Sequence, residues 1–251
     1  MKKITTPLFS ILMLLALCGF TYENTNSDFV KCEYIGTENV SKIVVEDVNA
    51  DILIKKSDTN SIVVEYYDLS DNPVYTISAT AETLEIKKFY DPNTSVAASP
   101  RKPLVVYLPD KQMHEISVYN RGGSIKCESV DATEFSANMV SGNITLNNVS
   151  ADNIELQSRV GDISIVNVVS NSIDISGVIT DISFNCVLAY NYNCSTQKGN
   201  ISGTIVGSSN EYSIDSYTFL GSNNLSNKVI TDGKNVIYVR TWIGNIELTF
   251  V

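Results

Sequence analysis

Five isoleucines recur at a constant interval of 19 residues, and this period limits the folds open to the chain. They are Ile125, Ile144, Ile163, Ile182 and Ile201. Each follows a Gly or Thr and then a Ser, Asn or Asp, so the five positions share one local frame. A fixed period of about 20 residues is typical of a solenoid, in which each repeat buries its apolar side only against its neighbours.

A second apolar set recurs nine positions earlier with the same period, at Phe135, Ile154, Ile173 and Tyr192. Around both sets, apolar and polar residues alternate over short segments, which is the pattern of a strand and not of a helix. Strands that recur at constant phase stack parallel and in register, and connections between parallel strands are right-handed. We therefore predict an all-β protein, a single-stranded parallel β-helix with right-handed coils of 19 residues.

The repeat phrase also occurs outside the regular run. Ala50-Asp51-Ile52 lies near the start and Gly244-Asn245-Ile246 near the end, which predicts a β-helix domain over residues 40–251. Ile62 and Val64 continue the early spacing and are assigned to the same parallel stack. Clusters of Gly, Pro, Ser and Asn predict two irregular inserts, a hairpin plus loop near 66–103 and longer loops near 207–235.

The residue before each central isoleucine is suited to a tight corner, because Gly and Asn tolerate positive φ. The corresponding polar residues are Asn143, Asp162, Asp181 and Asn200. We expect them to form one structural ladder on the outside of a corner, with stacked side chains bonding to one another. On the following strands, Thr145, Ser164, Ser183 and Ser202 are expected to point outward.

The N-terminus has the features of an export signal over residues 1–18. Lys2 and Lys3 precede an apolar stretch from Leu8 to Leu17 that is too short to span a membrane. Two hypotheses follow for its processing. An ordinary signal peptidase cleaves after Cys18, or Cys18 is lipidated at a lipobox. Residues 19–39 would then form a short polar tether and an N-terminal cap, and the protein would lie in the cell envelope.

The charge of the chain restricts its partners. A formal net charge of −10, with no basic stripe, argues against nucleic acid. The same charge argues against an anionic membrane surface, so contact with a membrane is expected only through a lipid anchor at Cys18. No nucleotide-binding glycine loop is present, and neither a cofactor nor a metal is predicted.

Few residues offer catalytic chemistry. The single histidine, His114, lies in a polar connection and supports neither a triad nor a histidine-rich zinc site. Carboxylates offer an alternative, since Asp162 lies one coil from Asp181 and Glu155 one coil from Asp174, and paired carboxylates can bind Ca²⁺ or act as acid and base. Only Arg159 lies near them to hold an anionic sugar, which favours a non-enzyme.

The cysteines other than Cys18 allow only a general structural interpretation. Cys127 and Cys194 fall on inward positions, whereas Cys32 and Cys186 do not, and a disulfide among them stays open.

Aromatic residues gather toward the C-terminus, and most are expected in strands. A binding patch of exposed tyrosines is the alternative. The C-terminal aromatic residues are Tyr190, Tyr192, Tyr212, Tyr217, Phe219, Tyr238 and Trp242.

The order of these phrases resembles a family of bacterial envelope proteins known as "putative adhesins". Val105 to Pro109 is followed by Ile116-Ser117-Val118, then by the Gly-[Asn/Asp]-Ile repeats, and the chain closes on Ile243 to Leu248. The resemblance covers residues 40–251 and implies an adhesin-like β-helix, related to the GIN domain, without a catalytic motif. Thr180 departs from the repeat by replacing a glycine.

Together these features predict a non-enzymatic interaction module of the cell envelope. Its rigid body would present a surface to a glycan, or to an envelope or host protein. The alternative function is a β-helix enzyme, a lyase or hydrolase, that cleaves polysaccharide.

Overall fold

The computed structural model describes residues 29–36, 39–69, 73–89, 101–231 and 235–251. The segment 1–28, with the predicted export signal, Cys18 and most of the tether, lies outside these residues. Within them, no helix is long and apolar enough to cross a membrane. The strands are β1 (Phe29–Gly36), β2 (Lys42–Asp47), β3 (Asp51–Lys56), β4 (Ile62–Leu69), β5 (Tyr75–Ala79), β6 (Thr83–Lys88), β7 (Pro103–Leu108), β8 (Met113–Glu128), β9 (Asp131–Asn147), β10 (Ser150–Val160), β11 (Ile163–Val166), β12 (Val169–Ile179), β13 (Ile182–Lys198), β14 (Ile201–Ile205), β15 (Tyr212–Leu220), β16 (Asn235–Ile243) and β17 (Ile246–Phe250), with one 3₁₀ turn at Ser209–Glu211.

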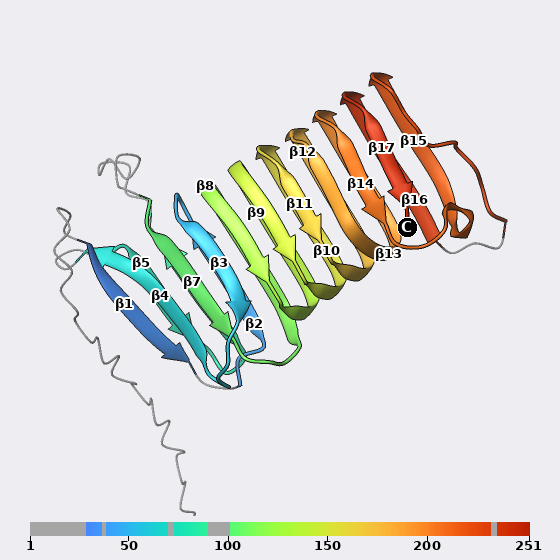
Figure 1. The fold of residues 1–251 in the computed structure, drawn as a ribbon. Coiled ribbons are helices and arrows are strands. Elements are labelled where there is room, and N and C mark those ends of the chain that lie inside the picture. The colour runs from blue at the N-terminus through green and yellow to red at the C-terminus, as the bar shows by residue number, and fades with distance from the viewer. Residues whose placement is uncertain (1–28, 37–38, 70–72, 90–100, 232–234) are drawn as a thin grey trace, which may run out of the picture.

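The strands stack into an elongated solenoid-like body (Figure 1), and the prediction of an all-β protein with parallel strands is confirmed. Its first face runs in the spatial order β6, β2, β8, β9, β10, β12, β13, β16, β15. The second face runs β7, β3, β8, β9, β11, β13, β14, β17. The long strands β8, β9 and β13 turn a corner and contribute to both faces.

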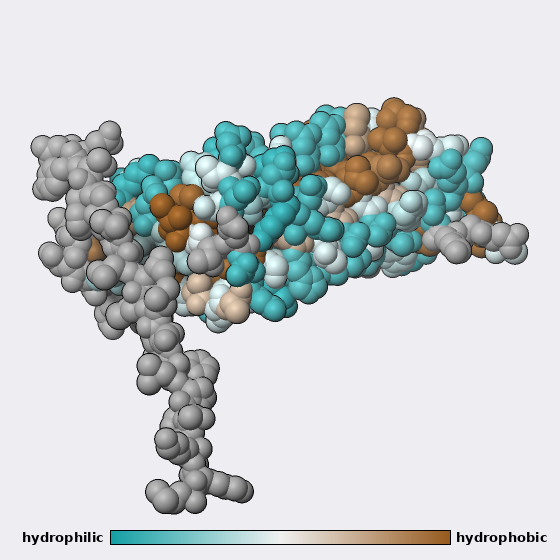
Figure 2. Space-filling model, turned by 90° about the horizontal axis from the view of Figure 1, so that it is seen from below, coloured by the Kyte–Doolittle hydropathy of each residue, from teal (hydrophilic) through white to brown (hydrophobic). Residues whose placement is uncertain are grey.

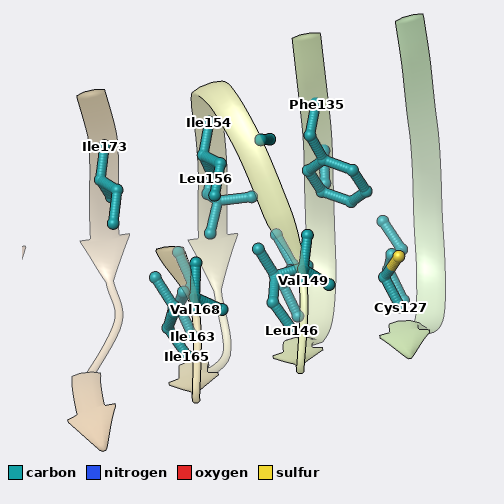
Figure 3. Close-up of a cluster of buried hydrophobic side chains, with 14 of the residues drawn as sticks. Cys127, Phe135, Leu146, Val149, Ile154, Leu156, Ile163, Ile165, Val168 and Ile173 are labelled. Atoms are coloured by element: carbon teal, nitrogen blue, oxygen red, sulfur yellow. The ribbon is translucent and has the colours of Figure 1, made fainter. Parts of the chain in front are cut away.

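The repeated isoleucines form the core of this body. Ile144, Ile163 and Ile182 are register partners on the second face, and each is fully buried. Figure 3 shows buried side chains of successive strands in two rows, with Ile154 and Leu156 of β10 above Ile163 and Ile165 of β11. Burial of one such side chain contributes roughly 1.5–3 kcal/mol, and a single coil has no other apolar surface to pack against.

The corners need backbone shapes that few residues adopt. Gly142 has φ 139°, and a Cβ there would lie 1.8 Å from the carbonyl oxygen of Gly123 in the preceding coil. At a second corner, Ser129, Asn148, Asn167 and Cys186 all have φ between 52° and 55°. Asparagine tolerates this left-handed region better than most residues do. The stack therefore stays regular because residues with tolerant backbones recur at both corners.

Thr180, the departure from the repeat, is explained by an exchange with Gly177. Other coils place a larger side chain first and glycine three residues later, as in Ser158 and Gly161. Here the buried Thr180 side chain fills the space and donates to the Ser158 carbonyl at 3.3 Å. A Cβ added at Gly177 would lie 2.7 Å from the Thr180 Cβ. In this coil the Thr180 side chain therefore occupies the space that the residue at position 177 would otherwise fill.

This exchange predicts a rescue by double substitution. Gly177→Ser should destabilise the protein by about 1–3 kcal/mol, because a second side chain is forced beside Thr180. Adding Thr180→Gly should recover most of that loss by restoring the arrangement of the neighbouring coils. Urea unfolding of the two single variants and the double variant measures the coupling. Strictly additive effects would contradict the exchange.

At the N-terminal end the prediction for Ile62 and Val64 is wrong. They lie in β4, which pairs antiparallel with β7 and with β1. The coil of β2 and β3 lies between β8 on one side and β6 with β7 on the other. The direction of β4 is therefore opposite to that of β7, the outermost strand of the parallel stack at this end. The antiparallel strands β1, β4 and β5 cover this end.

At the C-terminal end the segment 207–235 is more than the predicted loops. It contains β15, which pairs in parallel with β16 along the first face. The chain passes outward from β14 to β15 and then returns. On the first face β16 lies between β13 and β15, and on the second face β17 pairs with β14. Tyr212 and Ile214 make β15 a strand of the core, since both are buried.

Candidate functional site

The four predicted ladder residues lie at one corner, where the side chains of Asn143, Asp181 and Asn200 accept hydrogen bonds from backbone N–H groups of the adjacent coil. Asn143 Oδ1 accepts the Asp162 N–H at 2.9 Å, and Asp181 Oδ1 accepts the Asn200 N–H at 2.7 Å. Asn200 Oδ1 accepts from Asn245 at 2.9 Å in the same way. The expected bonds between stacked side chains are therefore replaced here by bonds to backbone N–H groups, which the open corner would otherwise leave unpaired.

Side-chain stacking of the expected kind occurs at the other corner, where Asn167 Nδ2 donates to Asn148 Oδ1 at 3.2 Å. This second ladder was not predicted, although its residues share one phase of the 19-residue repeat: Ser129, Asn148, Asn167 and Cys186. Both ladders join neighbouring coils, and their side chains are engaged in holding the stack together.

The carboxylates of Glu155 and Asp174 accept hydrogen bonds from side-chain amides. Glu155 and Asp174 are register partners on the first face. Asp174 accepts a hydrogen bond from Asn193 at 2.7 Å, and Glu155 accepts one from Gln157 at 2.7 Å. Among the described residues, no group of three or more His, Cys, Asp and Glu side chains could hold a metal ion.

The nucleophile candidates are separated from one another. His114 is exposed and lies within β8, not in a connection. Among the described residues, Cys32, Cys127, Cys186 and Cys194 form no disulfide. Burial raises the pKa of the Cys127 and Cys194 thiols, so both stay protonated and unreactive at neutral pH.

The C-terminal aromatic residues divide into an inner and an outer group. Tyr192 and Tyr212 point inward, each 1% exposed, with ring centroids 6.0 Å apart. Their hydroxyls donate to the carbonyls of Val187 and Ala189 at 2.9 and 2.8 Å. Because both rings are buried and their hydroxyls are paired, this inner group supports the core and is closed to ligands.

The outer group lies on the first face at its C-terminal end. It consists of Tyr217 and Phe219 from β15 and Tyr238 and Trp242 from β16, and we call it the aromatic face. Trp242 is 59% exposed, Phe219 54% and Tyr217 47%. The rings of Phe219 and Trp242 are stacked, with centroids 4.9 Å apart and planes at 21°. Figure 2 shows apolar side chains gathered toward this end of the molecule.

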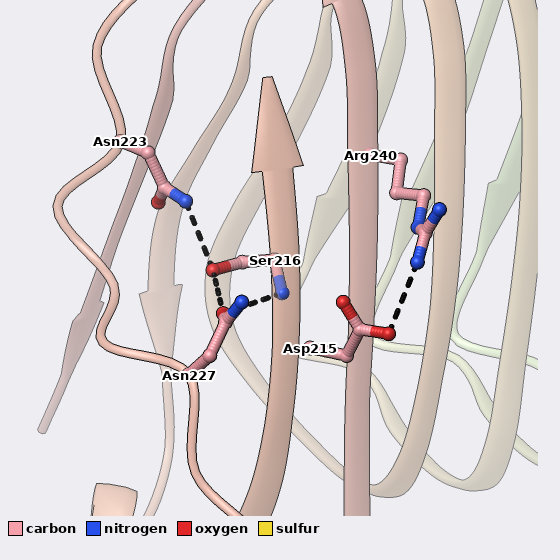
Figure 4. A network of polar contacts seen from close by, with 5 residues as sticks. All are labelled: Asp215, Ser216, Asn223, Asn227 and Arg240. Atoms are coloured by element: carbon pink, nitrogen blue, oxygen red, sulfur yellow. Dashed lines mark hydrogen bonds and ion pairs between the residues drawn. The ribbon is translucent and has the colours of Figure 1, made fainter. Parts of the chain in front are cut away.

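Arg240 stands among these rings in a fixed position. Its guanidinium lies 4.5 Å from the centre of the Tyr238 ring and donates to Asp215 at 3.1 Å (Figure 4). Behind it, Asn227 accepts from the N–H of Ser216 at 2.8 Å, which attaches the return segment to β15. Two partners therefore hold the arginine, and the strand beneath Tyr217 is held by the return segment.

A cavity of about 550 Å³ adjoins the aromatic face. Its volume is in the range of small-ligand sites. It draws on three strands that are distant in the sequence but adjacent on the first face. Its lining residues are Ser195, Thr196, Gln197, Tyr217, Arg240, Thr241 and Trp242.

The aromatic residues of this site could be recognised in the sequence, but their assembly into one site could not. The outer rings lie on strands, as expected for most of these residues, and they include a phenylalanine and the tryptophan as well as tyrosines. Ser195 and Gln197 were not singled out, because the insertion of β16 beside β13 could not be read from spacing. Of the residues named beforehand, Tyr217, Phe219, Tyr238 and Trp242 come together here, while Tyr190 lies outside the cavity lining.

The chain belongs to the Toastrack DUF4097 family, whose model matches residues 40–218. This membership confirms the family resemblance predicted from the sequence. No curated protein matches the sequence.

Among solved structures, a putative adhesin from Bacteroides fragilis is similar, with a TM-score of 0.52 and 14% identity over 88% of this chain and 97% of that one. A putative adhesin from Parabacteroides distasonis has a TM-score of 0.41 and 13% identity over 89% and 98% of the two chains. A putative lipid binding protein from the same organism has a TM-score of 0.40 and 13% identity over 89% and 98%. At these identities the first likeness supports the fold alone, and the two weaker ones carry no argument.

Proposed function

We propose that this protein is a non-enzymatic interaction module of the cell envelope, which binds a glycan or protein partner through the aromatic face. The observation that carries the proposal is the exposure of Tyr217, Phe219 and Trp242 beside a cavity. Exposed apolar groups gathered in one patch mark interaction surfaces on soluble proteins. Tyr and Trp are also the residues that contribute most per side chain at such surfaces.

The rest of the body suits a scaffold. Its long faces carry small polar side chains, and its corner ladders join each coil to the next. A stack with paired corners holds the aromatic face rigidly, which lowers the entropy lost on binding. Export through residues 1–18, with either release or lipidation at Cys18, is part of the same proposal and would bring the module to the envelope.

Cleavage of polysaccharide is the other function considered, and no contact in the described residues favours it. The acidic pair Glu155 and Asp174 is hydrogen-bonded to Gln157 and Asn193, and Arg159 is not among their partners. An acid and base pair would need one carboxyl group with a raised pKa beside an ionised one.

The proposal predicts that binding to isolated cell envelopes depends on the aromatic face. The double variant Tyr217→Ala/Trp242→Ala should lose most envelope binding in a sedimentation assay, because both rings provide large contact areas. Tyr190→Ala is the matched control, since Tyr190 is 56% exposed but outside the cavity lining. Equal binding by all three proteins, or product release from polysaccharide, would contradict the proposal.

A further inference from the structure

The chemistry of the cavity narrows the class of its ligand, if the aromatic face is the binding surface proposed above. Tyr217 and Trp242 supply flat apolar surface, and Ser195, Gln197 and Arg240 supply hydrogen-bonding groups around it. A ligand that matches must be apolar on one flat side and polar around its rim. A pyranose ring has this character, because its C–H groups gather on a face and its hydroxyls lie at the edge.

The charges in the cavity favour a neutral ligand. Among the described residues, Arg240 is the only charged one that lines the cavity, and Asp215 already pairs with that guanidinium at 3.1 Å. An anionic ligand would compete with Asp215 and approach a protein with a net charge of −10. A cationic ligand would approach Arg240 itself. A neutral ligand could use the remaining N–H donors of the guanidinium without breaking its ion pair.

The site is also held in one shape. Phe219 stacks on one side of the Trp242 indole, and Tyr238 lies beneath Arg240. Ser195 and Arg240 are register partners, as are Arg240 and Tyr217, so three adjacent strands hold these side chains side by side. Little side-chain freedom is left to be lost when a ligand binds.

We propose that this cavity binds a neutral oligosaccharide. A sugar ring packs its C–H face on Trp242 and Tyr217, while its hydroxyls bond to Gln197, Ser195 and Arg240. The polar cavity on the second face, lined by Ser202, Thr204 and Glu247 among others, offers no aromatic surface for this contact. The ligand is therefore assigned to the first face.

The fluorescence of Trp242 can report binding directly, because it is the only tryptophan in the chain. The purified protein is titrated with cellohexaose, laminarihexaose and mannohexaose as neutral probes, and with an oligogalacturonate as the acidic probe. At least one neutral probe should give a saturable change in tryptophan emission, with calorimetry confirming the affinity. The acidic probe should bind more weakly than the best neutral one.

Three variants test the assignment by calorimetry, after circular dichroism has shown that each is folded. Tyr217→Ala should weaken binding about tenfold, the scale of one aromatic contact. Gln197→Ala should weaken it without removing any aromatic surface, and Tyr190→Ala should leave it unchanged. Failure of every neutral probe, tighter binding of the acidic probe, or an equal loss in Tyr190→Ala would overturn the inference.

The two proposals fail in different ways. If the envelope assay depends on Tyr217 and Trp242 but no oligosaccharide binds, the partner is a protein and the sugar assignment is wrong. If a neutral oligosaccharide binds through these residues but isolated envelopes do not, the sugar site stands and the envelope role is wrong.

Discussion

Ile163→Asp is expected to destabilise the protein by at least about 4 kcal/mol, because it places an unpaired charge in the core. Ile163 is fully buried between its register partners Ile144 and Ile182. The inserted carboxylate would have apolar neighbours along the stack and no cation among them. The loss should be visible as a large shift of the urea midpoint in far-ultraviolet circular dichroism.

Ser183→Asp is the control for this substitution. Ser183 lies one coil away at the neighbouring outward position and is exposed. The same carboxylate there should change stability by no more than about 0.5 kcal/mol, because water still surrounds it. If the two variants unfolded at the same urea concentration, the inward and outward assignment of the repeat would be wrong.

Gly142→Ala is expected to cost about 3 kcal/mol or more, although it adds one methyl group. The residue has φ 139°, and the new Cβ would meet the Gly123 carbonyl oxygen at 1.8 Å. Backbone strain and overpacking each contribute roughly 1–3 kcal/mol, and the atom in the way is backbone that cannot rotate aside. Thermal unfolding followed by circular dichroism measures the loss.

Gly122, in the coil before Gly142, is the matched control for this substitution. A Cβ on Gly122 would lie 3.5 Å from the Val48 carbonyl oxygen, an ordinary contact. Gly122→Ala should therefore leave stability nearly unchanged or raise it slightly, because alanine reduces the freedom of the unfolded chain. If Gly142→Ala were tolerated as well as Gly122→Ala, the corner would not require glycine at position 142.

The central coils could be predicted from the sequence because their residues repeat without slippage. Ile144, Ile163 and Ile182 pair as neighbours in both the sequence pattern and the structure. The phase of a repeat fixes which residues point inward. It does not fix which coils are adjacent, since Ile201 pairs with Ile246 and Ile52 pairs with Ile125.

The same limit explains what could be predicted of the site. Residue type alone indicated that Tyr217 and Trp242 belong to an aromatic group near the C-terminus. Their neighbours Ser195 and Gln197 become visible only when β16 is known to lie beside β13. That placement depends on the packing of Tyr212 and Ile214 at the end of the core, which no period in the sequence encodes.

The entry of β16 and β17 between two earlier segments has a consequence for how the protein is completed. A simple repeat protein can lose its last repeat and remain a shorter rod, because each repeat contacts only its neighbours. Here β16 lies between β13 and β15 on the first face, and β17 continues the second face beside β14. A chain that stops before Asn235 would keep its outermost strand and lose the layer beneath it. The aromatic face therefore cannot assemble until β16 has been synthesised.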